Sequence, residues 1–176
     1  PQLFLLNSAD CGVPQKRERV FFCAIRDDIE APPLKLAPMH RWISAGEATQ
    51  DLQVLTTDEI KDTKATGTDL RFWKNTKPGA NYSNASIKEN GKNSFFNHIK
   101  FDGNLPTYTI TANTQVLTHW AEMRHFTLRE IKRFGSFPDD YQAKTDKIGK
   151  YMIGMSVPPK MTEQVARAVI DQWLTI

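Results

Sequence analysis

The sequence has only two cysteines, Cys11 and Cys23, which form neither a CxxC pair nor a disulfide-rich framework. Their scarcity excludes a small disulfide-stabilised domain and favours a reducing cytosol, so we expect a cytoplasmic protein. No apolar run approaches the roughly 20 residues that a bilayer-spanning helix needs. The N-terminal residues have no basic leader, and their apolar run is too short for a signal peptide, so we expect no membrane contact.

The sequence also lacks the spacing of a metal site. Its four histidines are scattered and are expected to be ordinary surface or core residues: His40, His98, His119 and His125. The length of 176 residues suits one ordinary domain or two small ones with a real core. Because Pro1 is followed at once by strand-like sequence, we expect a chain cut from something longer.

A modest positive charge is concentrated in the middle of the chain. The formal net charge is +3, and between residues 61 and 100 eight Lys or Arg stand against three Asp or Glu. A basic section that carries aromatic residues is compatible with binding to a phosphate backbone. It is equally compatible with a solvated surface, so the charge alone does not decide between the two.

The pattern of apolar residues predicts several elements. Continuous apolar runs at 3–6 and 20–25 indicate a β-hairpin whose strands are buried on both faces. A helix is expected within 41–55, a loop-rich and separately folded insert over 56–103, and a strand at 107–111.

Two helices are expected near the C-terminus. Thr127 and Glu130 form a capping box at the start of a short helix, and Gly135 is expected to end it in the left-handed conformation. The last helix starts near Pro158. It has one apolar face, which residues 31–115, a second copy or nothing at all would cover: Met161, Val165, Ala168, Val169 and Trp173.

Three segments stand out, although each has a plain structural reading. Residues 12–19 place arginines beside Gln15 at a strand entrance, which suits bidentate capture of carbonyl or phosphate oxygens or simply makes a solvated basic turn. Residues 124–141 combine the capped helix with a Phe-Pro-Asp turn. Residues 153–159 form a Gly-x-Ser turn at a helix N-terminus, where free N–H groups face a polar or anionic ligand.

Together, in this order, the three segments resemble the C-terminal portion of the DNA cytosine-5 methyltransferases, particularly bacterial and phage restriction-modification enzymes. Residues 7–20 look like motif VIII of that family, 124–141 like motif IX and 153–159 like motif X. The resemblance implies an α+β chain. A small irregular target recognition domain would accompany a hairpin and a C-terminal helix that belong to a doubly wound α/β methyltransferase domain.

The resemblance also implies a division of the chain. Residues 1–30 would be the motif VIII hairpin of the catalytic domain and 31–115 the variable target recognition domain. Residues 116–150 would be the motif IX segment that completes the recognition domain. Residues 151–176 would be motif X and the C-terminal helix of the catalytic domain.

In this family the target cytosine is flipped out of the duplex, a cysteine thiolate adds to C6, and C5 takes a methyl group from S-adenosyl-L-methionine. By resemblance, Arg19 would hydrogen-bond the O2 atom of the flipped cytosine. A positive donor there makes sense because the ring gains electron density when the thiolate adds. Arg17 would lie by the backbone or neighbouring catalytic groups, and Gln15 would support both arginines.

The resemblance implies further contacts with cofactor and DNA. Four motif X residues would lie by S-adenosyl-L-methionine: Gly154, Met155, Ser156 and Val157. The family usually has Asn where this chain has Met155, and a thioether cannot donate a hydrogen bond. Contacts with double-stranded DNA would come from the recognition segment and the basic insert: Thr109, Ile110, Thr111, Trp73, Lys74 and Lys77. Trp73 is also open to the reading of an ordinary packing residue.

Several parts of the family are missing from this sequence. The Gly-rich cofactor loop, the Pro-Cys nucleophile loop and the Glu-Asn-Val motif have no counterpart. A nucleophilic cysteine needs solvent access and a lowered pKa, and the sequence around Cys11 and Cys23 indicates both for neither residue. We therefore predict a chain that is inactive alone and works with an N-terminal catalytic half, in cis or in trans. The alternatives are a stand-alone DNA-binding specificity subunit and a basic structural module that binds no nucleic acid.

Overall fold

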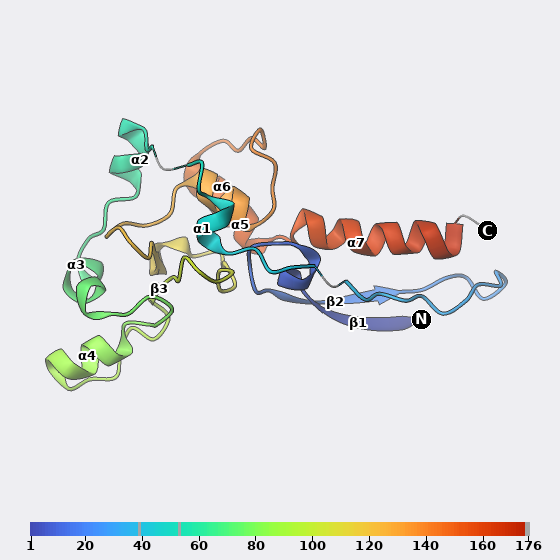
Figure 1. Cartoon of the computed structure of the whole chain (residues 1–176), viewed down its shortest axis with the longest axis horizontal. Helices are drawn as coiled ribbons and strands as arrows, with labels where there is room; N and C mark the ends of the chain where they lie inside the picture. Colours follow the sequence, from blue (N-terminus) through green and yellow to red (C-terminus); the bar gives the residue numbers. More distant parts are fainter. Residues whose placement is uncertain (39, 53, 175–176) are drawn as a thin grey trace.

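The computed structural model describes residues 1–38, 40–52 and 54–174, so four residues of the expected segments, 39, 53, 175 and 176, lie outside it. Helices and short strands are mixed along an elongated molecule (Figure 1). A hairpin and the C-terminal helix lie side by side at one end, and the helices of the predicted insert lie at the other. In the described part of the chain, no helix is long and apolar enough to cross a membrane.

The expected hairpin is present. Strands β1 (Gln2–Asn7) and β2 (Glu18–Cys23) pair antiparallel, with Leu3 opposite Phe22 and Leu5 opposite Val20. The prediction that both faces are buried is wrong, because these four side chains are 62–68% exposed. Side chains alternate across a strand, so a layer on one side of a two-stranded sheet covers only every second residue.

The covering layer is helix α7 (Pro159–Val169), which continues as a π-helical turn over Ile170–Leu174. Its apolar side chains pack on the inner face of the hairpin, on the loop before β2 and on the connector after it. This cluster, together with the segments that carry it, is called the hairpin unit: Leu6, Cys11, Val13, Cys23, Leu34, Met161, Val165 and Trp173. Of the covers expected for the apolar face of this helix, residues 31–115 contribute Leu34, whereas the cover by the hairpin and the loop before β2 was not expected.

The middle of the chain is irregular. It contains α1 (Ala45–Ala48), α2 (Thr57–Asp62), α3 (Thr68–Phe72), α4 (Ser83–Asn90) and one short parallel pair, β3 (Ile99–Lys100) with β4 (Leu117–Thr118). The helix expected within 41–55 shrinks to four residues. Residues 107–111 are extended but form no strand of a sheet, because their backbone partners lie in the loop before β2.

The capped helix is confirmed as α5 (Leu128–Phe134), in which the amide of Glu130 donates to Thr127 Oγ1 at 3.1 Å. The prediction for Gly135 is wrong, because its φ is −84° and the left-handed residue is Ser136 at +58°. The glycine is needed for another reason. A Cβ on Gly135 would lie 2.7 Å from Cγ2 of Ile153 in helix α6 (Asp146–Met155), so the glycine lets the two helices approach.

A second cluster joins the irregular middle to α5 and α6. We call it the recognition core: Ala45, Phe101, Ile110, Leu117, Phe126, Ile131, Phe134 and Ile153. Seven of these eight residues are at most 2% exposed. Aromatic rings contact one another in this cluster; Phe126 and Phe134, for example, meet edge to face at 5.1 Å. The core takes residues from three of the four predicted segments, and the division of the chain stays a prediction.

Candidate functional site

The loop before β2 runs beside the segment 107–110. The amide of Thr107 donates to the Pro14 carbonyl at 3.0 Å, and the amide of Lys16 donates to the Thr107 carbonyl at 2.8 Å. One residue pair further along, Thr109 Oγ1 donates to the Lys16 carbonyl at 2.8 Å. The segment that resembles motif VIII and residues 107–111, called the recognition segment, therefore lie side by side although they are far apart in sequence.

Gln15 connects this pair of segments to helix α5. Its side-chain oxygen accepts from the Ile110 amide at 3.0 Å, and its side-chain nitrogen donates to the Phe134 carbonyl at 3.3 Å. Gln15 is only 2% exposed. A buried amide with both ends satisfied holds three backbone segments in register.

Arg17 makes the second connection. One guanidinium nitrogen donates to the Ile110 carbonyl at 2.6 Å, and the other donates to the Gly154 carbonyl at 2.9 Å. Burial, with the charge of Arg19 adding to it, lowers the pKa of Arg17 to about 10, which leaves the group protonated at neutral pH. Both terminal nitrogens donate to carbonyls of this chain, whereas the buried Nε atom has no hydrogen-bond partner among the described residues. Gln15, Arg17, Ile110 and Gly154 are called the junction cluster below.

Arg19 differs from Arg17 in what it leaves free. Its side chain is half-buried and donates one hydrogen bond, from Nη1 to the Glu18 carbonyl at 2.7 Å. Within the described ranges of the chain it has no other hydrogen-bond or ion-pair partner. The two arginines of the same sequence motif thus separate into an internal connector and an available donor.

The recognition segment presents alternate side chains to solvent. Thr109 and Thr111 are exposed, whereas Ile110 is 0% exposed and lies in the recognition core. The structure argues against the predicted DNA contact through the Ile110 side chain, because that side chain is fully buried. Its backbone groups are also taken, by Gln15 and Arg17.

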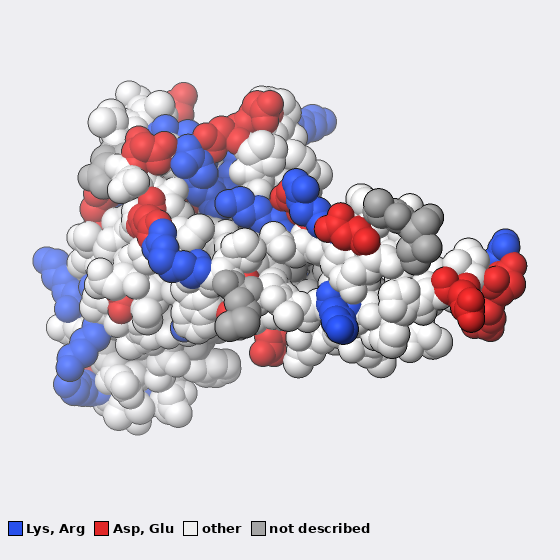
Figure 2. Space-filling view, turned by 45° about the vertical axis from the view of Figure 1, so that its right-hand side comes forward, with Lys and Arg blue, Asp and Glu red and all other residues white. Residues whose placement is uncertain are grey.

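The basic insert touches the recognition segment. Tyr108 donates its hydroxyl to the Gly79 carbonyl at 2.7 Å, which brings the turn after Lys77 against residues 107–111. Lys74 and Lys77 are exposed, and neither has an ion-pair partner among the residues that the structure describes. Figure 2 shows Lys and Arg side chains over this end of the molecule with acidic side chains among them, and a further acidic group at the opposite end.

Trp73 is engaged within the protein. Its indole nitrogen donates to the His119 carbonyl at 2.9 Å, and the ammonium of Lys100 lies 3.5 Å from the ring centroid. The Lys100 ammonium also donates to the Trp73 carbonyl. These contacts favour the packing interpretation of Trp73 over base stacking.

Of the four residues expected near the cofactor, Gly154 and Ser156 are engaged within the protein, whereas the side chains of Met155 and Val157 are exposed. A Cβ on Gly154 would lie 2.2 Å from the Thr111 carbonyl oxygen, so the glycine allows the recognition segment to lie directly on α6. Ser156 donates its hydroxyl to the Ile153 carbonyl at 2.8 Å. Met155 and Val157 are 61% and 40% exposed. These residues fit one apolar wall of a cofactor site and supply no donor set for the rest of it.

Neither cysteine is placed for nucleophilic chemistry. Burial, reinforced by the charge of Asp10, raises the pKa of the Cys11 thiol to about 11, so the thiol is protonated at neutral pH. Cys23 packs in the hairpin unit with 9% exposure. No cluster of three or more His, Cys, Asp or Glu side chains in the described ranges could hold a metal ion.

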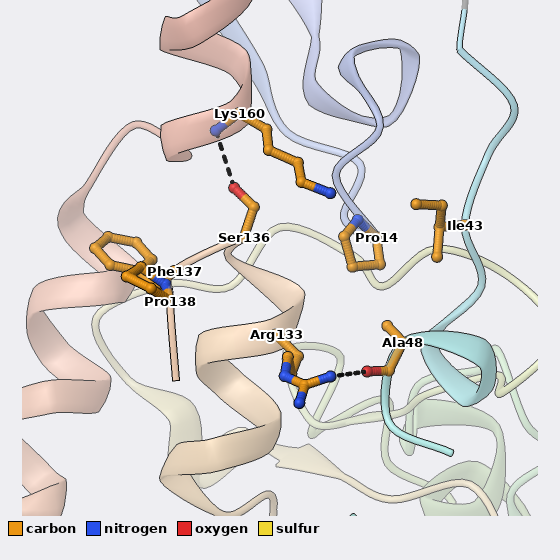
Figure 3. A pocket seen from close by; sticks show the side chains of 8 residues that line it. All are labelled: Pro14, Ile43, Ala48, Arg133, Ser136, Phe137, Pro138 and Lys160. Atoms are coloured by element: carbon orange, nitrogen blue, oxygen red, sulfur yellow. Dashed lines mark hydrogen bonds between the residues drawn. The ribbon is translucent and has the colours of Figure 1, made fainter. Parts of the chain in front are cut away.

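A cavity of about 380 Å³ opens at the seam between the hairpin unit and the recognition core (Figure 3). Pro14, Arg133 and Lys160 reach its wall from three different segments. Ser136 Oγ accepts from the Lys160 amide at 3.2 Å, which ties the start of α7 to the turn after α5. The guanidinium of Arg133 is paired with Asp51 and Asp139. Since this charge is already neutralised within the protein, we assign the cavity to packing between the two clusters and not to ligand binding.

No sequence pattern predicts the hydrogen-bond acceptors of Gln15 and Arg17, because these acceptors are backbone carbonyls. Arg17 and Gln15 are identifiable as polar residues next to a strand, but the carbonyls of Phe134 and Gly154 carry no side-chain identity. A glycine inside a helix lowers helix stability, so it often marks a position where packing leaves no room for a side chain. Gly154 could therefore have indicated, from the sequence, that another segment lies directly on this helix.

The fold is shared with parts of two solved methyltransferases. A solved DNA modification methyltransferase encoded within an E. coli prophage superposes with a TM-score of 0.62 at 18% identity, covering 100% of this chain and 61% of that chain. The Entamoeba histolytica methyltransferase EhMeth superposes with a TM-score of 0.53 at 14% identity, covering 97% of this chain and 53% of that chain.

The chain belongs to the C-5 cytosine-specific DNA methylase family, whose model matches residues 2–171. It is 31% identical to the type II methyltransferase M.BbvI of Brevibacillus brevis, over 98% of this chain and 49% of that protein. It is 25% identical to M1.HphI of Haemophilus parahaemolyticus, over 94% of this chain and 46% of that protein. The chain thus spans about half the length of the curated relatives it matches, and the family uses S-adenosylmethionine as its methyl donor.

Proposed function

We propose that this chain is the DNA-recognition and target-cytosine-handling part of a DNA (cytosine-5-)methyltransferase that uses S-adenosyl-L-methionine. The observation that carries the proposal is the contrast within one motif. Arg17 is consumed by the Ile110 and Gly154 carbonyls, whereas Arg19 keeps donors free beside them. The chain thereby holds an available guanidinium at a fixed distance from the recognition segment.

In this proposal, Arg19 donates to the O2 atom of the flipped cytosine. The cytosine ring gains electron density when a thiolate adds to it, and a fixed cation near O2 stabilises that charge more than it stabilises the resting base. The family's nucleophilic thiolate would come from outside this chain, because Cys11 and Cys23 are buried.

DNA would contact the exposed hydroxyls of Thr109 and Thr111 and the ammonium groups of Lys74 and Lys77. Hydroxyl and ammonium donors suit phosphate oxygens, which position a duplex without reading its sequence. Trp73 keeps its packing role in this proposal, since its indole donor is already used.

Met155 and Val157, with the backbone around Gly154, would form one wall of the S-adenosyl-L-methionine site, and the bound cofactor would supply the methyl group. The remaining walls would come from the catalytic half of the family, in cis or in trans. We further propose that the protein acts in the cytoplasm and methylates DNA only when both halves are together.

The test is transfer of labelled methyl groups to mixed-sequence duplex DNA. It compares the chain alone, the chain with the polypeptide of the same genome that matches the remaining half of the family, and that mixture carrying Arg19→Ala. Arg26→Ala is the matched control, because Arg26 follows the same strand and is exposed and paired with Asp28. Activity is expected in the unmutated mixture and in the control, with a loss on the order of 100-fold in Arg19→Ala.

Two outcomes would contradict the proposal. Activity of the isolated chain would show that a nucleophile lies within it. Inactive mixtures that still bind DNA in a salt-dependent manner would assign the chain to the specificity subunits without an enzymatic role.

A further inference from the structure

A carboxylate of the insert meets a histidine of the motif IX-like segment inside the protein. Asp69 lies in α3, His125 lies shortly before α5, and each residue is only 4% exposed. The Nε2 atom of His125 is 3.2 Å from the Oδ2 atom of Asp69. These two side chains are called the Asp69–His125 pair. The pair joins two parts of the chain that are far apart in sequence.

The other ring nitrogen of His125 fixes where the protons of this pair lie. Nδ1 is 3.1 Å from the Leu117 carbonyl oxygen, and because a carbonyl oxygen only accepts, Nδ1 carries a hydrogen and donates it. In a neutral imidazole the second nitrogen then has only a lone pair. A lone pair that faces an ionised carboxylate at 3.2 Å is repelled by it, so a further proton must lie between Nε2 and Oδ2. The pair holds one proton more than a neutral histidine and an ionised aspartate hold separately.

The other titratable groups near Asp69 do not replace this proton. The Oδ1 atom of Asp69 has no hydrogen-bond partner among the described residues, and it lies 3.8 Å from Nδ1 of His98, which has none either. His98 therefore faces the other carboxylate oxygen and leaves the contact at Oδ2 unchanged. Tyr82 stacks on His98, and its hydroxyl is hydrogen-bonded to Thr118. Burial raises the pKa of Tyr82, so its hydroxyl stays neutral.

The nearby cations are also engaged elsewhere. Arg124, next to His125 in the chain, directs its guanidinium to Glu130 at 2.8 Å. The Lys100 ammonium donates to the Trp73 carbonyl. Within the described ranges, Asp69 has no ion-pair partner besides the two histidines. A buried carboxylate without a partner is costly, so the contact with His125 depends on the shared proton.

The pair lies where the insert is attached to the rest of the protein. The amide of His125 donates to the carbonyl of Thr63, ahead of α3, at 2.7 Å. After α3 the chain continues to Lys74 and Lys77, the exposed ammonium groups of the proposed DNA contact. A displacement of α3 therefore moves these two groups relative to the recognition segment.

We propose that Asp69 is a positioning residue, which holds the DNA-contacting insert on the recognition core through a proton that it shares with His125. Loss of this proton as the pH rises leaves a lone pair against a buried carboxylate, which releases α3 and weakens DNA binding. The inference rests on the proposed function for its DNA step only, since the shared proton follows from the contacts of His125.

The direction of the pH effect follows from proton counting. Above about pH 7.5 an unfolded histidine is neutral and an unfolded aspartate is ionised. Folding then takes up the proton that the pair needs, so stability falls as the pH rises. Uptake of one proton changes the folding equilibrium constant about tenfold for each pH unit.

The experiment measures urea unfolding of the full chain between pH 7 and pH 9 for three proteins. In Asp69→Asn the amide nitrogen donates to the Nε2 lone pair of a neutral His125, so the contact needs no extra proton. Asp58→Asn is the matched control, because the Asp58 side chain in the neighbouring α2 is 93% exposed. We expect the folding equilibrium constant of the unchanged chain and of Asp58→Asn to fall about tenfold more per pH unit than that of Asp69→Asn. Other groups that titrate in this range, such as Cys11, act equally in all three proteins.

Equal pH dependence in all three proteins would overturn the inference. An unchanged chain whose stability does not fall over this range would overturn it as well, whether or not the variants fold. His125→Gln provides a second variant, and it must lose the same pH dependence because its side chain does not titrate.

DNA titration at constant salt over the same pH range tests the positioning step. The affinity of the unchanged chain should fall on the order of tenfold relative to Asp69→Asn as the insert is released. Equal changes in affinity, with different changes in stability, would show that the pair does not position the DNA contacts. Absence of DNA binding in every protein at pH 7 would refute the proposed function and leave the shared proton intact.

Discussion

The two larger hydrophobic clusters among the described residues are built in opposite ways. The recognition core is enclosed on all sides: Phe126 and Phe134 are at most 2% exposed, and the junction cluster satisfies the backbone groups around it. The hairpin unit is covered by α7 on one side and bare on the other, with Phe22 66% exposed. The recognition core therefore has no large exposed apolar side chain among its members, whereas the hairpin unit leaves a large apolar surface uncovered.

The largest expected effect compares the same substitution in the two regions. Phe134→Ala leaves a cavity in the enclosed core and should lower the free energy of unfolding by about 3–5 kcal/mol. Phe22→Ala removes a ring that already faces water and should change it by less than about 0.5 kcal/mol in the isolated chain. Urea unfolding measures both. Similar losses of unfolding free energy in the two variants would contradict this comparison, because the outer face of the hairpin would then be packed in solution.

The next comparison concerns the two arginines. Arg17→Met removes charge-assisted hydrogen bonds to two buried carbonyls and should lower the free energy of unfolding by about 3 kcal/mol. Arg19→Met should leave stability within about 0.5 kcal/mol and act only on methyl transfer by the assembled halves. Thermal unfolding beside the methyl-transfer assay separates the two. A stability loss at Arg19 equal to that at Arg17 would contradict the division of roles.

A smaller effect is expected at the glycine of the junction cluster. Gly154→Ala brings a Cβ within 2.2 Å of the Thr111 backbone, which must move, so unfolding should become easier by about 2 kcal/mol and DNA affinity should fall. Gly149→Ala on the same helix is the control, because its Cβ meets side chains and no backbone: the movable ends of Leu128 at 2.8 Å and the Cβ of Ala143 at 3.1 Å. Denaturant unfolding and DNA titration measure the pair. Unchanged DNA affinity in a destabilised Gly154→Ala would mean that the junction does not set the recognition segment.

The smallest effect is a pH dependence of the recognition core. Burial, with the charge of Arg124 adding to it, lowers the pKa of His119 to about 4 from its ordinary 6.5. Between these values the unfolded chain binds more protons, so stability falls as the pH is lowered, by about 1 kcal/mol for each unit.

The asparagine variant tests the cause of that pH dependence. In His119→Asn the amide oxygen replaces the Nδ1 atom that accepts from the Ala121 and Glu122 amides, and no proton is taken up. The stability of the variant should therefore fall less steeply from pH 6.5 downward. If stability falls equally steeply with pH in both proteins, the pH dependence comes from groups other than His119.

Local chemistry was predictable from the sequence. The capping box at Thr127 and Glu130 and the hairpin register depend on residues a few positions apart or on alternation, and both are present. Predictions that relied on what surrounds a residue did worse. Residues 20–25 are continuously apolar, yet half of their side chains face solvent, because burial depends on layers that composition does not describe.

The same limit applies to the candidate site. The motif 12–19 identified Gln15, Arg17 and Arg19 as a group, but nothing in their order separates a connector from a donor. That separation needs the carbonyls of Ile110 and Gly154, which lie 93 and 137 residues away in the chain.

The amino-acid sequence by itself determined the family, the capped helix, the hairpin and the group of polar residues before β2, because these depend on residue identity and short-range spacing. Only the tertiary structure decided that Ile110 is buried, that Arg17 is consumed inside the protein and that Arg19 is free. It also decided that one face of the hairpin is open. These properties depend on which backbone groups and apolar layers meet in space, and contacts of that kind are set by packing over long sequence separations.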